Sequence, residues 1–294
     1  MSAVDDVREW EARGERTTVD GRSVWVLDVP AAVPAADGNN PLLVLHGFPS
    51  CSYDWRHVLD ALRAHRRVVA VDFLGFGLSD KPDLRYGMRL QADVVEAVAR
   101  HRGLDSVALL THDMGDTVGG ELLARSLEGT LPFAVTRRVL TNGSIYIDMA
   151  HLTNGQQLLL SLPDEPTDLV VAEGFKAGLA GTFSPKSNVG DDELEAQWLF
   201  AERDGGNRML PRTIRYIEDR RAEERRFTGA IETHPSPVAI VWGADDPIAI
   251  LAMTEVLQRA RPDATLTVLD GVGHYPMIEA PERFAAAVTA ALAS

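Results

Sequence analysis

The sequence predicts an α/β protein with a mostly parallel, twisted sheet, helices on both faces of that sheet and a helical cap inserted in its middle. Short aliphatic runs alternate with turn clusters and with segments of helical period, which is the rhythm of βαβ units. This rhythm stops after residue 143 and resumes at residue 234. We therefore expect core segments at residues 1–143 and 234–294 and a helical cap at residues 144–233.

Each expected strand is a β-branched or aliphatic run that ends at a cluster of Gly, Pro or polar residues. Residues 23–29 alternate in polarity, which is typical of an early hairpin strand. The buried strands are expected at residues 42–45, 68–71, 107–110, 139–141, 238–242 and 266–269. Apolar residues spaced three and four apart predict helices at residues 54–64, 90–102, 116–127 and 281–292.

Composition excludes several classes of function. Lys and Arg number 29 and Asp and Glu 43, which gives a net charge of −14. A field of this sign repels phosphate backbones and anionic lipids, so we expect no nucleic acid or membrane partner. The acidic start lacks the features of a secretory signal, and no apolar run reaches the roughly 18 residues that span a bilayer. Because Cys51 is the single cysteine, no intramolecular disulfide can form, and we expect a cytoplasmic location.

The strand expected at residues 107–110 runs into Thr111, His112, Asp113, Met114 and Gly115 and then into a helix. A sharp connection of this kind exposes the side chain at its tip as a nucleophile. The usual tip is the serine of G-x-S-x-G, whereas this sequence has Asp113. A carboxylate attacks esters and amides poorly, but it can attack a strained or activated sp³ carbon and form an ester on the enzyme. Asp113 is therefore the predicted nucleophile.

A second turn, His46-Gly47-Phe48-Pro49, follows the strand expected at residues 42–45. It can aim the backbone N–H of Phe48 at the same point as the N–H of Met114. Two converging donors form an oxyanion hole, which is useful when water attacks the carbonyl carbon of an ester on the enzyme. We expect His46 to hold this turn by hydrogen bonding.

Two further strand ends supply a base and an acid. His274 follows the last expected strand, and Asp245 and Asp246 follow the one before it. His274 would activate the hydrolytic water, while a carboxylate on its other ring nitrogen would orient it, in the chain order nucleophile, acid, histidine. We assign the acid to Asp246 and keep Asp245 as the alternative, because spacing does not separate adjacent acids.

Other patterns favour ordinary structural roles. Gly75-Phe76-Gly77 lacks the third glycine of a dinucleotide site, so no cofactor is expected. The eight histidines show no metal-binding spacing, so no metal is expected either. Cys51 has no evident base of its own, which favours a small buried side chain. The charged run at residues 220–226 is interpreted as a solvated helix face.

Several of these motifs resemble the epoxide hydrolase-like branch of the α/β-hydrolases. The resemblance rests on residues 46–55, 72–82 and 112–116. Residues 141–146, 215–230 and 273–276 are similar, within that branch, to bacterial hydrolases of the mesoderm-specific transcript protein type. The match covers about residues 40–290, including the cap.

This resemblance implies an α/β-hydrolase fold and the same site that the strand ends predict. The implied roles are Asp113 as nucleophile, His274 as base, Asp246 as acid, and Phe48 and Met114 as backbone oxyanion donors.

Epoxide hydrolases also use acids in the cap to protonate the leaving oxygen, usually a pair of tyrosines that stay protonated because their pKa is near 10. The resemblance assigns Tyr216 to this role and leaves the second donor open between Tyr146 and His151. His151 and Trp55 are assigned to substrate binding. Apolar cap segments at residues 158–162 and 175–183 predict a hydrophobic substrate.

The sequence therefore predicts a cofactor-independent epoxide hydrolase that converts a small hydrophobic epoxide to a vicinal diol. Haloalkane dehalogenation is the nearest alternative, because the same residues can displace halide from carbon. It is less favoured because neither Phe48 nor Met114 has a side-chain donor for a halide. A non-catalytic, ligand-binding α/β-hydrolase is a further alternative, and the complete set of Asp113, Asp246 and His274 argues against it.

Overall fold

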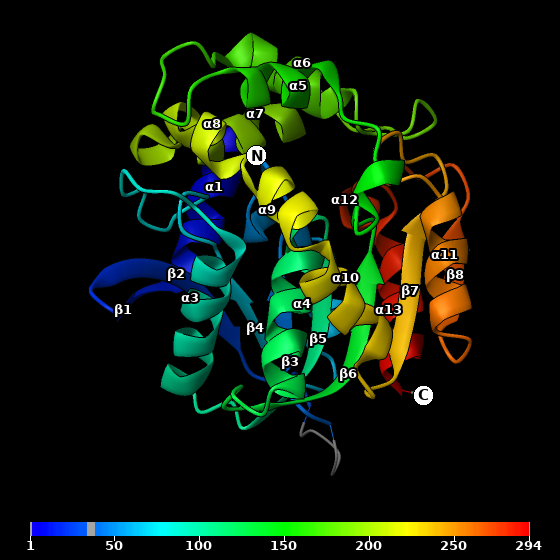
Figure 1. Cartoon of the computed structure of the whole chain (residues 1–294). Helices are drawn as coiled ribbons and strands as arrows, with labels where there is room; N and C mark the ends of the chain where they lie inside the picture. The colour runs from blue at the N-terminus through cyan, green and yellow to red at the C-terminus, as the bar shows by residue number, and fades with distance from the viewer. Residues whose placement is uncertain (1, 34–38, 294) are drawn as a thin grey trace.

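The computed structural model describes residues 2–33 and 39–293. Within these residues, eight strands form one sheet in the order β1-β2-β4-β3-β5-β6-β7-β8 (Figure 1). β2 is antiparallel to both of its neighbours, and all pairs from β4 to β8 are parallel. The strands are β1 (Glu15–Val19), β2 (Arg22–Val29), β3 (Leu42–Leu45), β4 (Val68–Val71), β5 (Ser106–His112), β6 (Ala134–Thr141), β7 (Val238–Gly243) and β8 (Thr265–Leu269). The predicted fold class is confirmed.

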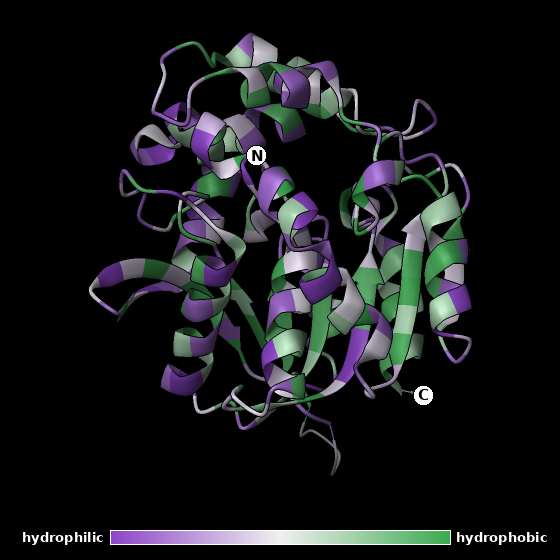
Figure 2. Ribbon diagram, viewed as in Figure 1, coloured by the Kyte–Doolittle hydropathy of each residue, from purple (hydrophilic) through white to green (hydrophobic). Residues whose placement is uncertain are grey.

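The central strands are buried because nearly all of their side chains are apolar. Every residue of β3, β4 and β7 is buried, and Figure 2 shows β7 mostly in the green of hydrophobic residues. β3 lies between β4 and β5, with Leu42 paired to Val68 on one side and to Ala108 on the other. β8 forms one edge of the sheet and has mostly exposed or half-buried residues.

Helices cover both faces of the sheet. On one face, α4 (Met114–Leu127) contacts β3, β5 and β6 and lies beside α3 (Met88–His101). On the opposite face, α13 (Pro281–Ala293) contacts β6, β7 and β8 and lies beside α2 (Leu59–Leu62) (Figure 1). The expected helix at residues 54–64 is two shorter pieces, the 3₁₀ turn η1 (Ser52–Trp55) and α2. No helix in the described part of the chain combines the length and the apolar composition needed to cross a membrane.

Four core elements were not predicted: α1 (Ala3–Arg13), β1, α11 (Ala252–Ala260) and α12 (Pro276–Glu279). α1 is highly charged and buries only Ala3, Val7 and Trp10, so few apolar residues mark its buried face in the sequence. Its N-terminus is closed by a capping box between Ser2 and Asp5. Trp10 packs on Trp25 with ring centroids 5.8 Å apart, which anchors α1 to the core.

The segment between β6 and β7 forms short helices over the carboxyl ends of the parallel strands (Figure 1). They are η2 (Ile147–Met149), α5 (Asn154–Ser161), α6 (Ala172–Ala180), α7 (Asp191–Glu202), η3 (Arg203–Met209), α8 (Leu210–Thr213), α9 (Tyr216–Ala222) and α10 (Glu224–Thr233). α10 differs from the others because it packs along α4. A Cβ on Gly120 would lie 2.7 Å from the carbonyl oxygen of Phe227, so the two helices are in backbone contact. The segment expected as cap therefore ends in a helix of the core layer.

Candidate active site

The predicted core residues of the site all lie at one edge of the sheet. Asp113 follows β5, Asp246 follows β7, His274 follows β8, and Phe48 lies in the turn after β3. Because these strands are parallel, their carboxyl ends meet at the edge where open α/β sheets bind ligands. The cap covers this edge (Figure 1), so the site lies between cap and core.

Asp113 occupies the tip of the turn between β5 and α4, with φ 48° and ψ −111°. Positive φ is costly for a residue with a side chain, so the surrounding contacts must hold it there. Gly115 permits this turn, since a Cβ there would lie 2.6 Å from the carbonyl oxygen of Leu45. A Cβ on Gly47 would lie 2.8 Å from the Cβ of Asp113. The two glycines let the turns after β3 and β5 approach each other.

The turn after β3 directs a backbone donor at the Asp113 carboxylate. The N–H of Phe48 donates to Oδ2 of Asp113 at 2.9 Å. Met114 begins α4, so its N–H has no acceptor within the helix. Nε2 of His46 accepts from the N–H of Phe73, so Nδ1 carries the ring proton and donates to the carbonyl oxygen of Gly47 at 2.8 Å. His46 thus holds this turn by hydrogen bonding.

Asp246 orients His274. Nδ1 of His274 donates to Oδ2 of Asp246 at 2.8 Å. The same oxygen accepts from Nδ2 of Asn142 at 2.7 Å, and Oδ1 accepts from the N–H groups of Ile248 and Ala249 at 2.7 and 3.0 Å. The position of this carboxylate is therefore fixed by groups other than His274.

Asp245 faces the cap instead. Its Oδ2 accepts from the Ser184 hydroxyl at 2.7 Å and lies 3.0 Å from Nζ of Lys186. The hydrogen bonds from Ser184 and Lys186 lower the pKa of Asp245. Of the two adjacent acids, the structure brings Asp246 to His274.

The charges around His274 set its protonation at rest. Burial on its own would lower the pKa of His274, but the charge and hydrogen bond of Asp246, together with the charge of Asp113, outweigh burial and raise it to about 9. The resting site therefore holds an imidazolium between two carboxylates at neutral pH. Removal of one of these negative charges would lower the pKa of His274 and favour its neutral form.

His112 supports the backbone of the base. Its Nε2 donates to the carbonyl oxygen of His274 at 2.8 Å. Burial lowers the pKa of His112 to about 3, so this ring is neutral at physiological pH. The residue just before the elbow tip therefore ties the turn after β5 to the loop that carries His274.

Two candidate tyrosines have different surroundings. Tyr216 begins α9 and is buried, and its ring centroid lies 5.6 Å from that of Phe48. Burial and the charge of Asp113 raise the pKa of Tyr216, while a hydrogen bond from Gln156 opposes this rise, so the hydroxyl interacts with both side chains. The Tyr146 hydroxyl donates to Glu232 of α10 at 2.8 Å. The structure thus brings Tyr216 to Asp113 and places Tyr146 against α10, which corrects the assignment of Tyr146.

His151 and Trp55 lie outside the site. The His151 side chain is exposed, although its backbone N–H donates to the carbonyl oxygen of Ile248 at 3.0 Å. Trp55 is buried in η1, where it packs on His112 and Phe284 with ring centroids 6.4 and 6.1 Å apart. Nearness to a motif in sequence did not put either side chain into the cavity, so both assignments to substrate binding are corrected.

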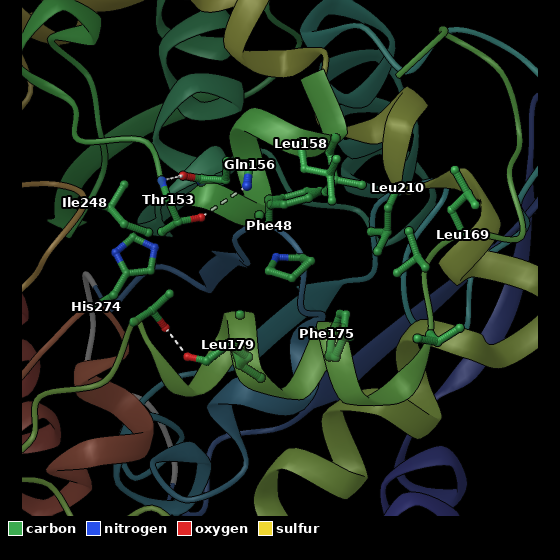
Figure 3. Close-up of a pocket in the computed structure, with 18 of the residues that line it drawn as sticks. Phe48, Thr153, Gln156, Leu158, Leu169, Phe175, Leu179, Leu210, Ile248 and His274 are labelled. Atoms are coloured by element: carbon green, nitrogen blue, oxygen red, sulfur yellow. Dashed lines mark hydrogen bonds between the residues drawn. The ribbon is translucent and has the colours of Figure 1, made fainter. Parts of the chain in front are cut away.

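A cavity of about 170 Å³ lies between cap and core. Figure 3 shows His274 at one end of it and Leu169 at the other. Gln156 and Thr153 are among the few polar groups in its wall. The apolar side chains of the wall are Phe48, Pro49, Leu158, Leu159, Leu169, Val170, Val171, Phe175, Leu179, Leu210 and Ile248. The predicted apolar cap segments thus contribute to this cavity.

Three polar residues near the site were missed by sequence reasoning. Asn142 directly follows β6, the same kind of position that marks Asp113, and this signal could have found it. Gln156 and Arg220 carry no such mark, because their roles depend on how α5 and α9 dock. Arg220 is 1% exposed, so the charged run at residues 220–226 is not a solvated face along its whole length.

The chain belongs to the alpha/beta hydrolase family, whose sequence profile matches residues 42–287. It is 40% identical to a Mycobacterium tuberculosis protein named "Putative hydrolase LipZ", over 97% of this chain and 98% of that protein. It is 33% identical to the mesoderm-specific transcript homolog protein of Homo sapiens, over 95% of this chain and 85% of that protein. The predicted resemblance is confirmed at this level, and the chain is a hydrolase of this family.

Solved structures share the fold. A haloalkane dehalogenase loop variant from Bradyrhizobium elkanii has a TM-score of 0.73 at 20% identity, covering 95% of this chain and 96% of that one. A bacterial membrane phospholipase A has a TM-score of 0.75 at 22% identity, covering 99% and 89% of the two chains. At such identities the likeness defines the architecture and leaves the reaction to the residues of the site.

Proposed function

We propose that this hydrolase opens a small apolar epoxide to a vicinal diol through an ester on Asp113. The observation that carries the proposal is the carboxylate at the elbow tip, which accepts from the N–H of Phe48 and interacts with the Tyr216 hydroxyl of the cap. A serine at this tip would favour acyl transfer. A carboxylate favours attack on a strained sp³ carbon, and the tyrosine supplies the proton that the opened ring needs.

In the first step, Oδ1 of Asp113 attacks a ring carbon. A new carbon–oxygen bond forms while the ring carbon–oxygen bond breaks, and the Tyr216 hydroxyl gives its proton to the ring oxygen. The products are a hydroxyalkyl ester and a Tyr216 phenolate. Because the ester is uncharged, the pKa of His274 falls. The His274 proton then restores the Tyr216 hydroxyl and leaves His274 neutral.

In the second step, neutral His274 takes a proton from water, and the water oxygen attacks the ester carbonyl carbon. The charge that develops on Oδ2 is held by the Phe48 N–H and the Met114 N–H. The intermediate collapses by breaking its bond to the diol oxygen, which takes up the remaining proton of the acid. Asp113 returns as a carboxylate and His274 as an imidazolium, so protons and charges balance over the cycle.

The cavity supports an apolar substrate. Its wall is mostly aliphatic and aromatic, and Phe48 lies between the His274 end and the Leu169 end (Figure 3). Apolar pockets with a few placed polar groups bind hydrophobic ligands and use those groups to orient them. Gln156, which acts on the Tyr216 hydroxyl, is the polar group that would orient the ring oxygen.

Haloalkane dehalogenation is the second candidate because one local similarity favours it. Residues of this chain are 36% identical over 102 positions to the haloalkane dehalogenase of Agrobacterium fabrum, which is 35% of this chain and 34% of that protein. A halide leaving group needs N–H or O–H donors around it. No tryptophan is among the described residues of the cavity wall. The wall side chains with an N–H or O–H group are Thr153, Gln156, Thr182, His274 and Tyr275. The Tyr216 hydroxyl beside Asp113 is a further candidate donor.

Intact-protein mass of His274→Gln tests both candidates, because this variant should form the ester but hydrolyse it very slowly. Incubation with aliphatic and aromatic epoxides should add the whole epoxide mass at Asp113. A mass gain from haloalkanes equal to the reagent less HX would support the dehalogenase instead. Asp113→Asn in the same background is the matched control and should gain no mass. A folded His274→Gln protein that gains no mass from either set would contradict both candidates.

A further inference from the structure

Arg220 lies on a cap helix, α9, but its side chain reaches the nucleophile turn of the core. Its guanidinium donates from Nε to the Thr117 hydroxyl at 2.7 Å, from Nη1 to the carbonyl oxygen of Ser144 at 2.9 Å, and from Nη2 to the carbonyl oxygen of Asp113 at 3.3 Å. Nη2 also lies 4.0 Å from Oδ1 of Asp113. Because the Phe48 N–H binds Oδ2, Arg220 is beside the oxygen that is left for attack.

The titratable groups that act electrostatically on Asp113 come from every element around it. They are His46, His112, Asp116, Tyr216, His274 and Tyr275. The two tyrosines are neutral at pH 7 because burial raises the pKa of each. Burial lowers the pKa of His46 and of His112, so both of these histidines are neutral as well.

The remaining charges leave Arg220 with a distinct role. Burial raises the pKa of Asp116 to about 8, so this acid is largely protonated at neutral pH. The His274 cation is hydrogen-bonded to Asp246. Among the described residues, the ion pair of Arg220 is with Asp113. A guanidinium keeps its charge at every pH at which a protein of this kind is folded, whereas the charge of His274 changes during the reaction.

We propose that Arg220 is a positioning residue of this site, which holds the backbone of Asp113 at the elbow and places a permanent positive charge beside its attacking oxygen. This role rests on the proposed function, in which Asp113 is the nucleophile. The same charge persists when Asp113 becomes a neutral ester. It then favours the second step, which restores a carboxylate beside the guanidinium.

A purely structural tie between cap and core would use the same hydrogen bonds without needing the charge. The contacts with Thr117 and with the Ser144 carbonyl would stabilise the docking of α9 in either case. The two roles differ in their pH dependence. Loss of a cation about 4 Å from a buried carboxylate makes ionisation of that carboxylate harder, whereas loss of a tie does not.

The test measures the rate of ester formation in the His274→Gln background, where the adduct accumulates and His274 no longer titrates. The probe is 1,2-epoxyhexane, and the adduct mass is followed over time from pH 4.5 to 8.5. Arg220→Gln removes the charge and Arg220→Lys keeps it. Arg221→Gln is the matched control, because Arg221 is an exposed neighbour on the same helix and the net charge changes equally.

We expect the acid limb of the rate profile to move to higher pH by about one unit or more in Arg220→Gln. Arg221→Gln should keep the limb of the parent. Arg220→Lys should also keep the limb but reach a lower plateau rate, because an ammonium cannot make the three forked contacts. Circular dichroism and thermal unfolding establish which variants are folded.

A folded Arg220→Gln protein with the acid limb of its parent would overturn the inference. So would Arg220→Lys with a limb moved as far as that of Arg220→Gln. If Arg220→Gln does not fold, the comparison of Arg220→Lys with Arg221→Gln decides: an unchanged limb with a lower plateau supports the role, and a moved limb contradicts it. A parent that forms no adduct at Asp113 would overturn the proposed function, and this role with it.

Discussion

The core and the cap contribute to this site in different ways. On the core side, Asp113, Asp246 and His274 each follow a parallel strand, and backbone N–H groups or buried polar side chains hold them in place. On the cap side, Tyr216 and Gln156 lie on the short helices α9 and α5 and meet the core through side chains. The core-side groups are thus held by the backbone and by buried polar groups of the core, whereas the cap-side groups depend on how α5 and α9 dock.

This difference separates two kinds of change. Under the proposed function, a substitution of Asp113 on the core side would prevent both chemical steps. A substitution of His274 or Asp246 would prevent the second step, hydrolysis of the ester. Substitutions on the cap side affect how the ring oxygen is protonated and which substrates fit, while water can still attack an ester already formed. The largest losses of activity are therefore expected in the core.

Asp246→Asn should cause the largest loss, with turnover falling by about a thousandfold or more. An amide in this place no longer stabilises an imidazolium, and it can turn an N–H toward Nδ1 of His274. Asp245→Asn is the matched variant, because this neighbour contacts Ser184 and Lys186 on the cap side. Its turnover should stay within a few-fold of the parent. The steady-state rate of diol formation gives the turnover of both variants. Equal losses in the two would contradict the assignment of Asp246 as the acid.

Tyr216→Phe should slow ester formation by about a hundredfold, because the ring oxygen then leaves without a proton donor. Tyr146→Phe removes a hydroxyl that donates to Glu232, so it should change the rate of ester formation only a few-fold. Time courses of adduct mass separate formation of the ester from its hydrolysis. If Tyr216→Phe forms the ester at the parent rate but hydrolyses it more slowly, Tyr216 does not donate the proton in ring opening.

The same division explains how much the sequence could predict. The strands at residues 42–45 and 68–71 have the predicted bounds, because short apolar runs between turn clusters can only be buried strands in this fold. Asp113 and His274 could be predicted to lie at the same edge of the sheet because parallel topology brings strand ends together. The choice between Asp245 and Asp246 needed coordinates, since both follow β7 and only the backbone turn decides which carboxylate faces inward.

The cap was predicted less well because its contacts are not periodic. The sequence assigns Tyr216 as one donor and leaves the second open between Tyr146 and His151, whereas the structure places the Tyr146 hydroxyl against Glu232 on α10. α10 itself lies within the segment expected as cap, yet it packs on α4. Arg220 belongs to a charged run that is typical of a solvated helix, but the orientation of α9 buries its side chain. These outcomes depend on how helices dock, which spacing in the sequence does not encode.

Asp54 links the core to the cap through its hydrogen bonds. It lies in the core turn η1 and accepts from Nε2 of Gln197 on α7 of the cap at 2.8 Å, and it also accepts from the Ser50 hydroxyl. Burial raises the pKa of Asp54 to about 7, despite the hydrogen bonds from Ser50 and Gln197, which lower it. The join between cap and core is therefore made through a carboxyl group that the fold favours in its protonated form.

The sign of the resulting pH dependence follows from the two states of this carboxyl. Its pKa in the folded protein is above the value of about 4 that an unfolded chain gives, so its contribution to stability is complete below that pH and is lost as pH rises through 7. Asp54→Asn has no such titration. The free energy of unfolding in urea should therefore fall between pH 5 and pH 8 by about 3 kcal/mol more in the parent than in Asp54→Asn. Parallel curves for the two proteins would mean that Asp54 stays ionised in the fold, and that the contact with Gln197 holds cap to core through a charged hydrogen bond.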